Sequence, residues 1–286
     1  MIYECVINIS EGTNVDLVAM IASAGGECVR DVHSDVDHNR SVLTIASQEI
    51  EEVTASAFAV VRTAIEHLEI DRHLGVHPRL GIVDVVPFVS YDNAGVEPSQ
   101  KIIEAAQNFG AKVHEEFHIP IFFYDEASSE KRTLPFIRKN AFSSIAPDLG
   151  NNMAHRTAGA MCIGAREPLV AVNITLETKD LALAQSIART VRESSGGIKG
   201  VRAIGLLLEN QNSVQVSMNI VDVVNVNTGE ICEEVRAIAD AHNVASSVEL
   251  VGLVPQKQFE MWSHSFLNWS GLDVSCTIEQ RLSHSE

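Results

Sequence analysis

The stretch Glu27-Cys-Val-Arg-Asp-Val-His33, with the run Arg40-Ser-Val-Leu-Thr-Ile-Ala46 that follows it, decides the fold. Apolar and β-branched residues dominate both runs, and a polar segment at 34–39 separates them. Runs of this kind bounded by turn residues are typical of strands. We therefore predict a hairpin of two strands, and the elements on either side of it give the fold class.

The hairpin lies in the middle of a longer pattern. Residues 2–9 are apolar and β-branched, which predicts a strand, and residues 14–24 carry apolar side chains at helical spacing. After the hairpin, residues 49–70 predict an amphipathic helix and residues 80–89 a strand buried on both faces. The order strand, helix, strand, strand, helix, strand is the split βαβ pattern of a ferredoxin-like fold.

The same order recurs later in the chain. Its predicted elements are strands at 169–176, 201–208, 213–220 and 247–254 and helices at 179–192 and 229–242. We therefore predict an α/β (α+β) protein with two ferredoxin-like α/β subdomains, residues 1–168 and residues 169–286. Between the two patterns, residues 99–109 predict a helix and residues 120–125 a strand. Residues 127–159 are rich in breaks and predict a long functional loop.

Composition and charge limit the possible functions. The chain has 286 residues, 45% of them hydrophobic, so it can bury a large core. Its 38 acidic residues against 21 basic ones give a net charge of −17, which argues against nucleic acid as a partner. No apolar run approaches the roughly 18 residues of a membrane span, and the N-terminus lacks a basic signal-peptide region. With five cysteines and no CxxC pair, we expect a cytoplasmic protein with buried thiols and no membrane partner.

His77 is the strongest single candidate for chemistry. It lies between Gly75 and Pro78, just ahead of the strand predicted from residue 80, so we expect a stiff turn to hold its ring at the mouth of a sheet. An imidazole titrates near pH ~6.5, which suits it to take and return a proton at neutral pH. The alternative is a loop histidine that only hydrogen-bonds to the backbone.

The hairpin loop carries a second group of candidates. Asp35 and Asp37, with His33 and His38, could orient a catalytic base or stabilise a developing positive charge. The alternative is an acidic turn whose side chains cap the local backbone.

Four arginines lie beside predicted loops or strand ends, namely Arg40, Arg79, Arg156 and Arg166. In an acidic chain, arginines gathered in break regions could bind carboxylates through paired hydrogen bonds. Each one alone could equally be a solvated surface charge.

A set of polar motifs runs in order through nearly the whole chain. The motifs are Glu4-Cys-Val-Ile-Asn-Ile-Ser-Glu-Gly12, Asp31-Val-His-Ser-Asp35 with Asn39-Arg40, Gly75-Val-His77-Pro78-Arg79-Leu-Gly81 with Asp84 and Pro87-Phe88, Pro147-Asp-Leu-Gly150, Gly164-Ala-Arg166 with Ala171-Val-Asn173, Arg192-Glu-Ser-Ser-Gly-Gly197, Gln215-Val-Ser-Met-Asn219 and Val251-Gly-Leu-Val-Pro255. Together they resemble the glutamate formiminotransferase family. The chain departs from the family pattern at Ile7 and Ile9, in place of Pro and Phe, at Asn151, in place of Pro, and at Val76, where Glu is common.

The resemblance implies transfer of the formimino group from N-formimino-L-glutamate to tetrahydrofolate, late in histidine breakdown. Tetrahydrofolate would serve as co-substrate, with no metal expected, and both partners would be small molecules. The fold implied is two α/β subdomains with a folate-binding tunnel between them, and we expect a homodimer. In bifunctional relatives a cyclodeaminase domain follows, which this chain is too short to contain.

The resemblance also assigns roles to particular residues. The family's catalytic histidine falls on His77, and Asp35 could orient it. The residues expected to bind substrate or folate are Gly150, Asn151, Asn152, Met153, Ala154, His155, Arg156, Thr157, Ala158, Gly159, Arg40, Arg79, Arg166 and Asn219.

Three other functions stay open from the sequence. One is a folate-binding or anion-binding protein that keeps the family fold without transferase activity. A second is a transferase specific for formylglutamate. The third is a metal-dependent hydrolase that would use His33, Asp35, His73 and His77, although Gly75 argues against the regular helix that would align the last two.

Overall fold

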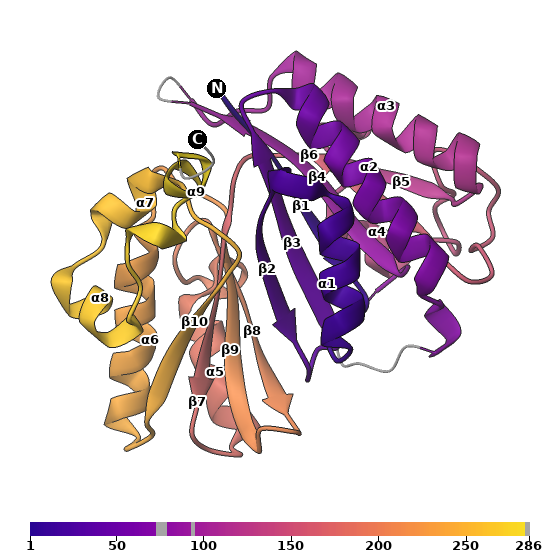
Figure 1. Cartoon of the computed structure of the whole chain (residues 1–286). Helices are drawn as coiled ribbons and strands as arrows, with labels where there is room; N and C mark the ends of the chain where they lie inside the picture. Colours follow the sequence, from indigo (N-terminus) through magenta and orange to yellow (C-terminus); the bar gives the residue numbers. More distant parts are fainter. Residues whose placement is uncertain (73–78, 93–94, 284–286) are drawn as a thin grey trace. The chain divides into compact units, whose positions relative to one another are not determined.

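The structure is a computed structural model that describes residues 1–72, 79–92 and 95–283. Its contacts divide the chain into two units, Met1–Glu167 (unit 1) and Pro168–Glu286 (unit 2), each with its own sheet (Figure 1). The prediction of two α/β subdomains is confirmed. The predicted tunnel between them stays a prediction.

Unit 1 is built on a six-stranded sheet. Its strands are β1 (Ile2–Ile9), β2 (Val29–Asp35), β3 (Arg40–Ser47), β4 (Val83–Tyr91), β5 (Ile121–Asp125) and β6 (Met161–Ala165), in the order β2-β3-β1-β4-β6-β5. The hairpin of β2 and β3 is confirmed, with Asp35 opposite Arg40 at its end. Strands β4, β1, β3 and β2 keep the ferredoxin-like order, with β1 antiparallel to both of its neighbours. Strands β6 and β5 extend that sheet in parallel.

Helices cover both faces of this sheet. Figure 1 shows α1 (Val15–Ala24), α2 (Ile50–His67) and α3 (Gln100–Phe117) on one face. The core on that side includes Leu43, Phe88 and Phe109. A smaller cluster that includes Phe122, Ile137 and Cys162 joins α4 (Leu134–Asn140) to the sheet. Strand β4 is covered by apolar contacts on both faces and is buried at all nine positions. It therefore provides a rigid base for residues 79–82, which lead into it.

Unit 2 repeats the ferredoxin-like order on a four-stranded antiparallel sheet. Its strands are β7 (Val170–Leu176), β8 (Val201–Leu208), β9 (Ser213–Ile220) and β10 (Ser246–Val251), in the order β10-β7-β9-β8. Its helices are α5 (Leu181–Val191), α6 (Thr228–Ala241), α7 (Gln256–Met261), α8 (His264–Ser270) and α9 (Ile278–Ser283). The buried Gln258 ties the C-terminal helices to the rest of the unit, since its amide accepts from Thr228 N and donates to the carbonyls of Val223 and Val226.

Some predicted boundaries were wrong, and two elements were missed. The strand expected from residue 80 begins at Val83, because residues 80–82 bond to other loops. Helix α3 continues to Phe117, well beyond residue 109. The expected irregular stretch 127–159 contains α4, and the strand β6 that follows it was not predicted.

Four of the five cysteines are buried, Cys28 is half-buried, and all five are free thiols. Burial raises the pKa of the Cys276 thiol to about 11, so this sulfur stays protonated at neutral pH. Within the described part of the chain, no helix is both long and apolar enough to cross a membrane.

Candidate functional site

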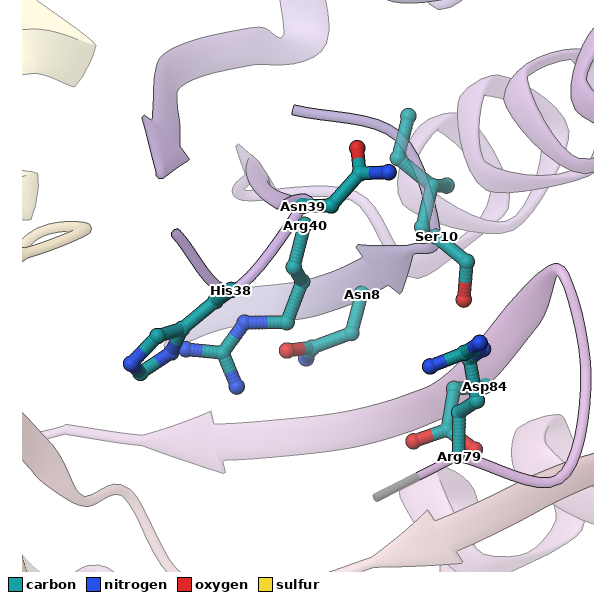
Figure 2. Close-up of a pocket in the computed structure, with 8 residues that line it drawn as sticks. Asn8, Ser10, His38, Asn39, Arg40, Arg79 and Asp84 are labelled. Carbon is teal, nitrogen blue, oxygen red and sulfur yellow. The ribbon is translucent and has the colours of Figure 1, made fainter. Parts of the chain in front are cut away.

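A small pocket lies in unit 1, where the end of β1, the start of β3 and the entry to β4 meet (Figure 2). The residues that line it are Asn8, Ile9, Ser10, His38, Asn39, Arg40, Arg79 and Asp84. Its volume is about 10 Å³, close to the smallest space that holds one water molecule. The pocket can therefore contact one small polar group but does not enclose a whole metabolite.

The hairpin loop is fixed against the end of β1. Asn39 has a left-handed backbone, with φ of 45°, and its Oδ1 accepts a hydrogen bond from Gly12 N at 2.9 Å. A Cβ on Gly12 would lie 2.4 Å from the carbonyl oxygen of Asp35 and 2.5 Å from the backbone nitrogen of Arg40, so only glycine permits this approach. Ser41 Oγ also donates to Glu11 O at 2.6 Å. These contacts fix the backbone on both sides of Arg40.

Asp84 is the buried carboxylate of the pocket, with only 3% of its surface exposed. Its Oδ1 accepts a hydrogen bond from Leu80 N at 2.6 Å. Its Oδ2 accepts from Nη2 of Arg138, which comes from α4. Both oxygens are therefore engaged, as a buried carboxylate requires.

Two further arginines face this pocket. In Figure 2 the Asn8 amide lies between Arg40 on one side and Arg79 with Asp84 on the other. Burial lowers the pKa of the Arg40 guanidinium, while the carboxylates of Asp35 and Asp84 oppose that shift. An arginine keeps its charge even when its pKa falls. The lining of a strongly acidic chain thus gathers positive charge at one place.

The predicted binding loop, residues 150–159, is attached on both sides of segment 73–78. Before that segment, Ile70 N donates to Thr157 O at 2.7 Å. After it, Ile82 N donates to Ala158 O at 3.0 Å, and Gly81 forms a β-bridge with Gly159. The end of the loop and the entry to β4 therefore form one connected piece of unit 1.

The rest of this loop is more exposed. Gly150, with φ of 96°, packs against the ring of His114, and residues 151–154 are exposed. Residues 155–159 form a tight turn in which His155 Nδ1 accepts from Ala158 N at 3.1 Å. Arg156 is exposed in this turn. These side chains can reach a ligand in solvent without moving the core.

The other predicted site residues border the pocket, lie elsewhere in the chain or fall outside the described residues. His77, with His73, Gly75 and Pro78, lies outside the described residues. Asp35 is half-buried at the end of β2, where its Oδ1 accepts from His38 N at 2.8 Å.

Arg166 does not line the pocket of unit 1, and Asn219 belongs to unit 2. Arg166 N donates to Phe88 O, which is about 13 Å along β4 from Asp84 at roughly 3.3 Å per residue. Its Nη1 donates to Glu167 O at 2.7 Å. Asn219 is an exposed residue of β9 in unit 2.

The described ranges contain no group of three His, Cys, Asp or Glu side chains that could hold a metal ion. The predicted metal alternative included His73 and His77, which lie outside those ranges. It therefore stays an untested alternative.

Sequence reasoning missed several residues at the pocket. Asn8, Ser10 and Asp84 stood inside the recognised motifs but were not chosen as site residues. The alternation of side chains along β1 was the available signal for Asn8, because a polar residue between Ile7 and Ile9 faces away from the core. Arg138 offered no such signal, since it reaches Asp84 across 54 residues of chain.

Comparison with known proteins shows that nearly the whole chain is similar to one group of transferases. The formiminotransferase domain, N-terminal subdomain, matches residues 2–166, and the formiminotransferase domain matches residues 171–281. A glutamate formimidoyltransferase of Streptococcus pyogenes serotype M1 is 36% identical over 273 residues, which are 90% of each chain. A glutamate formimidoyltransferase of Thermoplasma acidophilum is 33% identical over 297 residues, 98% of this chain and 96% of the relative. The formimidoyltransferase-cyclodeaminase of Gallus gallus is 35% identical over 277 residues, 89% of this chain and 50% of the relative.

Proposed function

The chain belongs to the formiminotransferase family, and on that premise we propose that it transfers the formimino group from N-formimino-L-glutamate to N5 of tetrahydrofolate. The products are L-glutamate and 5-formiminotetrahydrofolate. Membership of the family makes the protein a transferase. The identity of donor and acceptor is the proposal.

One observation of the structure carries the proposed donor. Arg40 and Arg79 line the same small pocket in a chain of net charge −17. Guanidinium groups bind carboxylates through paired, charge-assisted hydrogen bonds. We assign the two arginines to a carboxylate of formiminoglutamate, whose remaining atoms lie outside a pocket of this size.

Proton transfer is assigned to His77. N5 of tetrahydrofolate attacks the amidine carbon of the donor and forms a tetrahedral adduct, while the imidazole takes the N5 proton. The resulting imidazolium then protonates the glutamate nitrogen, the bond from that nitrogen to the amidine carbon breaks, and the base is regenerated. Asp35 is proposed to orient the imidazole or to balance the amidinium charge.

The folate is assigned to the loop at 150–159. The exposed side chains at 151–154 and Arg156 are available to it, and the bonds of Thr157 and Ala158 hold the end of the loop beside the entry to β4. Arg166 and Asn219 complete the proposed set of substrate contacts. Attachment of the loop to both flanks of residues 73–78 supports a site in which acceptor and base act together.

The direct test is an assay of the purified chain with formiminoglutamate and tetrahydrofolate, in which 5-formiminotetrahydrofolate is followed by its absorbance. We expect product that depends on both substrates, with formylglutamate giving slower transfer or none. Faster transfer from formylglutamate would overturn the choice of donor. Absence of product with either donor, from protein that still binds tetrahydrofolate, would favour a binding protein of the family fold.

A further inference from the structure

Arg138 is a charged residue that the proposed reaction does not use. It belongs to α4, whose Ile137 packs with Phe122 and Cys162 on the side of the sheet away from the main core. Its Nη2 donates to Asp84 Oδ2, and the two side chains are 24% and 4% exposed, respectively. A carboxylate this buried is unfavourable without partners of opposite charge, and Arg138 supplies the ion pair to its Oδ2.

The other oxygen of Asp84 controls the backbone beside the pocket. Asp84 Oδ1 accepts from Leu80 N, the peptide group that directly follows Arg79. The next residues are held by separate bonds, from Ser10 Oγ to Gly81 O at 2.9 Å and from Ser10 N to Ile82 O at 2.7 Å. The Leu80 carbonyl accepts from Ala160 N at 2.9 Å, and the bond from Leu80 N to Asp84 is the side-chain contact on the peptide group next to Arg79.

Asp84 lies between the pocket arginines and an apolar cluster: its charge opposes the lowering of the Arg40 pKa, and Arg79 lines the same pocket. Burial raises the pKa of the nearby Cys162 thiol, and the Asp84 charge raises it further, so that this sulfur is neutral. Val85 and Ala160 belong to the same apolar cluster as Cys162. Removal of Arg138 would take away the donor to Asp84 Oδ2 and let the carboxylate turn toward the pocket arginines, which weakens its hold on Leu80.

We propose that Arg138 is a positioning residue for the anion-binding pocket: its ion pair keeps the Asp84 carboxylate oriented, and Asp84 in turn helps to fix Leu80 and the backbone that carries Arg79. This inference rests on the proposed function only for the identity of the bound anion. The link from Arg138 to the Leu80 amide is a property of the fold and can be measured without turnover.

The chain supplies a matched control. Arg132 donates to Asp148 Oδ1, and Asp148 Oδ2 accepts from Phe123 N at 2.7 Å, so the same kind of pair holds a backbone amide elsewhere in unit 1. The Arg132 side chain is 8% exposed. The variants to compare are Arg138→Met, Arg138→Lys and Arg132→Met.

The first measurement is hydrogen exchange of the full chain, read on peptides that contain Leu80. We expect Arg138→Met to speed exchange at Leu80 at least about tenfold relative to the residues of β4, with Arg138→Lys close to wild type. Arg132→Met should instead act on the peptide that contains Phe123. Equal exchange at Leu80 in wild type and Arg138→Met, or equal speeding in Arg138→Met and Arg132→Met, would overturn the proposal.

The second measurement is steady-state kinetics with formiminoglutamate. We expect Arg138→Met to raise KM for the donor about tenfold while kcat changes by less than about threefold, and Arg132→Met to leave both near wild type. A fall in kcat alone would contradict a positioning role at the anion pocket. If the wild-type protein transfers nothing, the proposed function fails while the exchange measurement still decides the link between Arg138 and Leu80.

Discussion

At the scale of single residues, Arg40 and Arg79 carry the prediction about substrate binding. Arg79→Gln and Arg40→Gln each remove a charged hydrogen-bond donor from the pocket. A hydrogen bond to a charged group contributes about 1.5–3 kcal/mol, so KM for the donor should rise roughly 10-fold to 100-fold. Arg62→Gln is the control, because Arg62 pairs with Glu116 on the exposed surface of the helices. Unchanged KM in both pocket variants would remove the arginines from the site.

His77 carries the prediction about proton transfer. His77→Ala removes the proposed base, and general acid–base catalysis typically contributes about 10²–10⁴-fold to the rate. Turnover should fall by at least about 100-fold while the affinity for tetrahydrofolate, measured by calorimetry, stays near that of wild type. A variant that retains wild-type turnover would require another base.

The pocket was only partly predictable from single residues. Arg40 and Arg79 were expected because arginines at strand ends stand out in an acidic chain. Asp84 was missed as a site residue because a carboxylate inside an apolar run gives no sign of its partners. Arg138 became visible only through its contact with Asp84, since no local pattern brings α4 to the entry of β4.

At the scale of elements, substitution of Gly81 shows how close the loop at 150–159 must lie to the residues before β4. A Cβ at Gly81 would lie 2.2 Å from Ala160 O and 2.6 Å from Ala158 O, both backbone atoms. Gly81→Ala should therefore lower the free energy of unfolding by about 1–3 kcal/mol, as measured by urea denaturation. Gly95→Ala is the control, because among the described residues a Cβ at Gly95 would meet no atom within 4 Å beyond its chain neighbours, and its effect should stay within about 0.5 kcal/mol. Equal stability of the two variants would mean that the loop moves away without cost.

The stability of the turn between β1 and α1 should depend on pH through the carboxylate of Glu11. Burial alone would raise its pKa, but hydrogen bonds from Asn14 N, Thr13 N and the Thr13 hydroxyl, each 2.8 Å from Oε1, lower it below the usual value of 4.5. Because the folded pKa is lowered, the stabilisation is present above about pH 4.5 and is lost as the pH falls through the lowered value. Glu11 is partly exposed, so solvent screening limits the effect to about 0.5 kcal/mol.

The measurement for Glu11 is the difference in unfolding free energy between wild type and Glu11→Gln across this pH range. Wild type should be the more stable at pH 7, and the difference should disappear in acid, where Glu11 is protonated and resembles the amide. A difference that persists unchanged below the lowered pKa would show that the charge of Glu11 does not contribute.

The helices and strands were predicted well where apolar and polar residues alternate along the chain or where the order of elements repeats. The hairpin of β2 and β3 and the order of unit 2 followed from local apolar patterns. Strand β6 was missed because Met161-Cys-Ile-Gly-Ala165 is short and mixes small residues with apolar ones, and a buried parallel strand has no alternation. Helix α4 was missed because its seven residues are too few to establish a helical period.

At the scale of the whole molecule, two features of the sequence were decisive. The repeated order of strands and helices predicted two α/β units, and each unit has its own sheet. The collinear motifs across the chain predicted the family, which the matches to residues 2–166 and 171–281 confirm. Spacing could not reveal how the pocket is assembled, because its lining joins residues as far apart in the chain as Asn8 and Asp84.

The central claim is that this chain moves a formimino group onto a folate. The most direct measurement uses formiminoglutamate with an isotopic label in its formimino carbon and follows that carbon by NMR in the presence of the protein and tetrahydrofolate. We expect the label to appear on N5 of the folate, with one unlabelled glutamate released for each transfer, and no reaction without tetrahydrofolate. Release of the label by water, at a rate independent of tetrahydrofolate, would contradict the claim and favour a hydrolase.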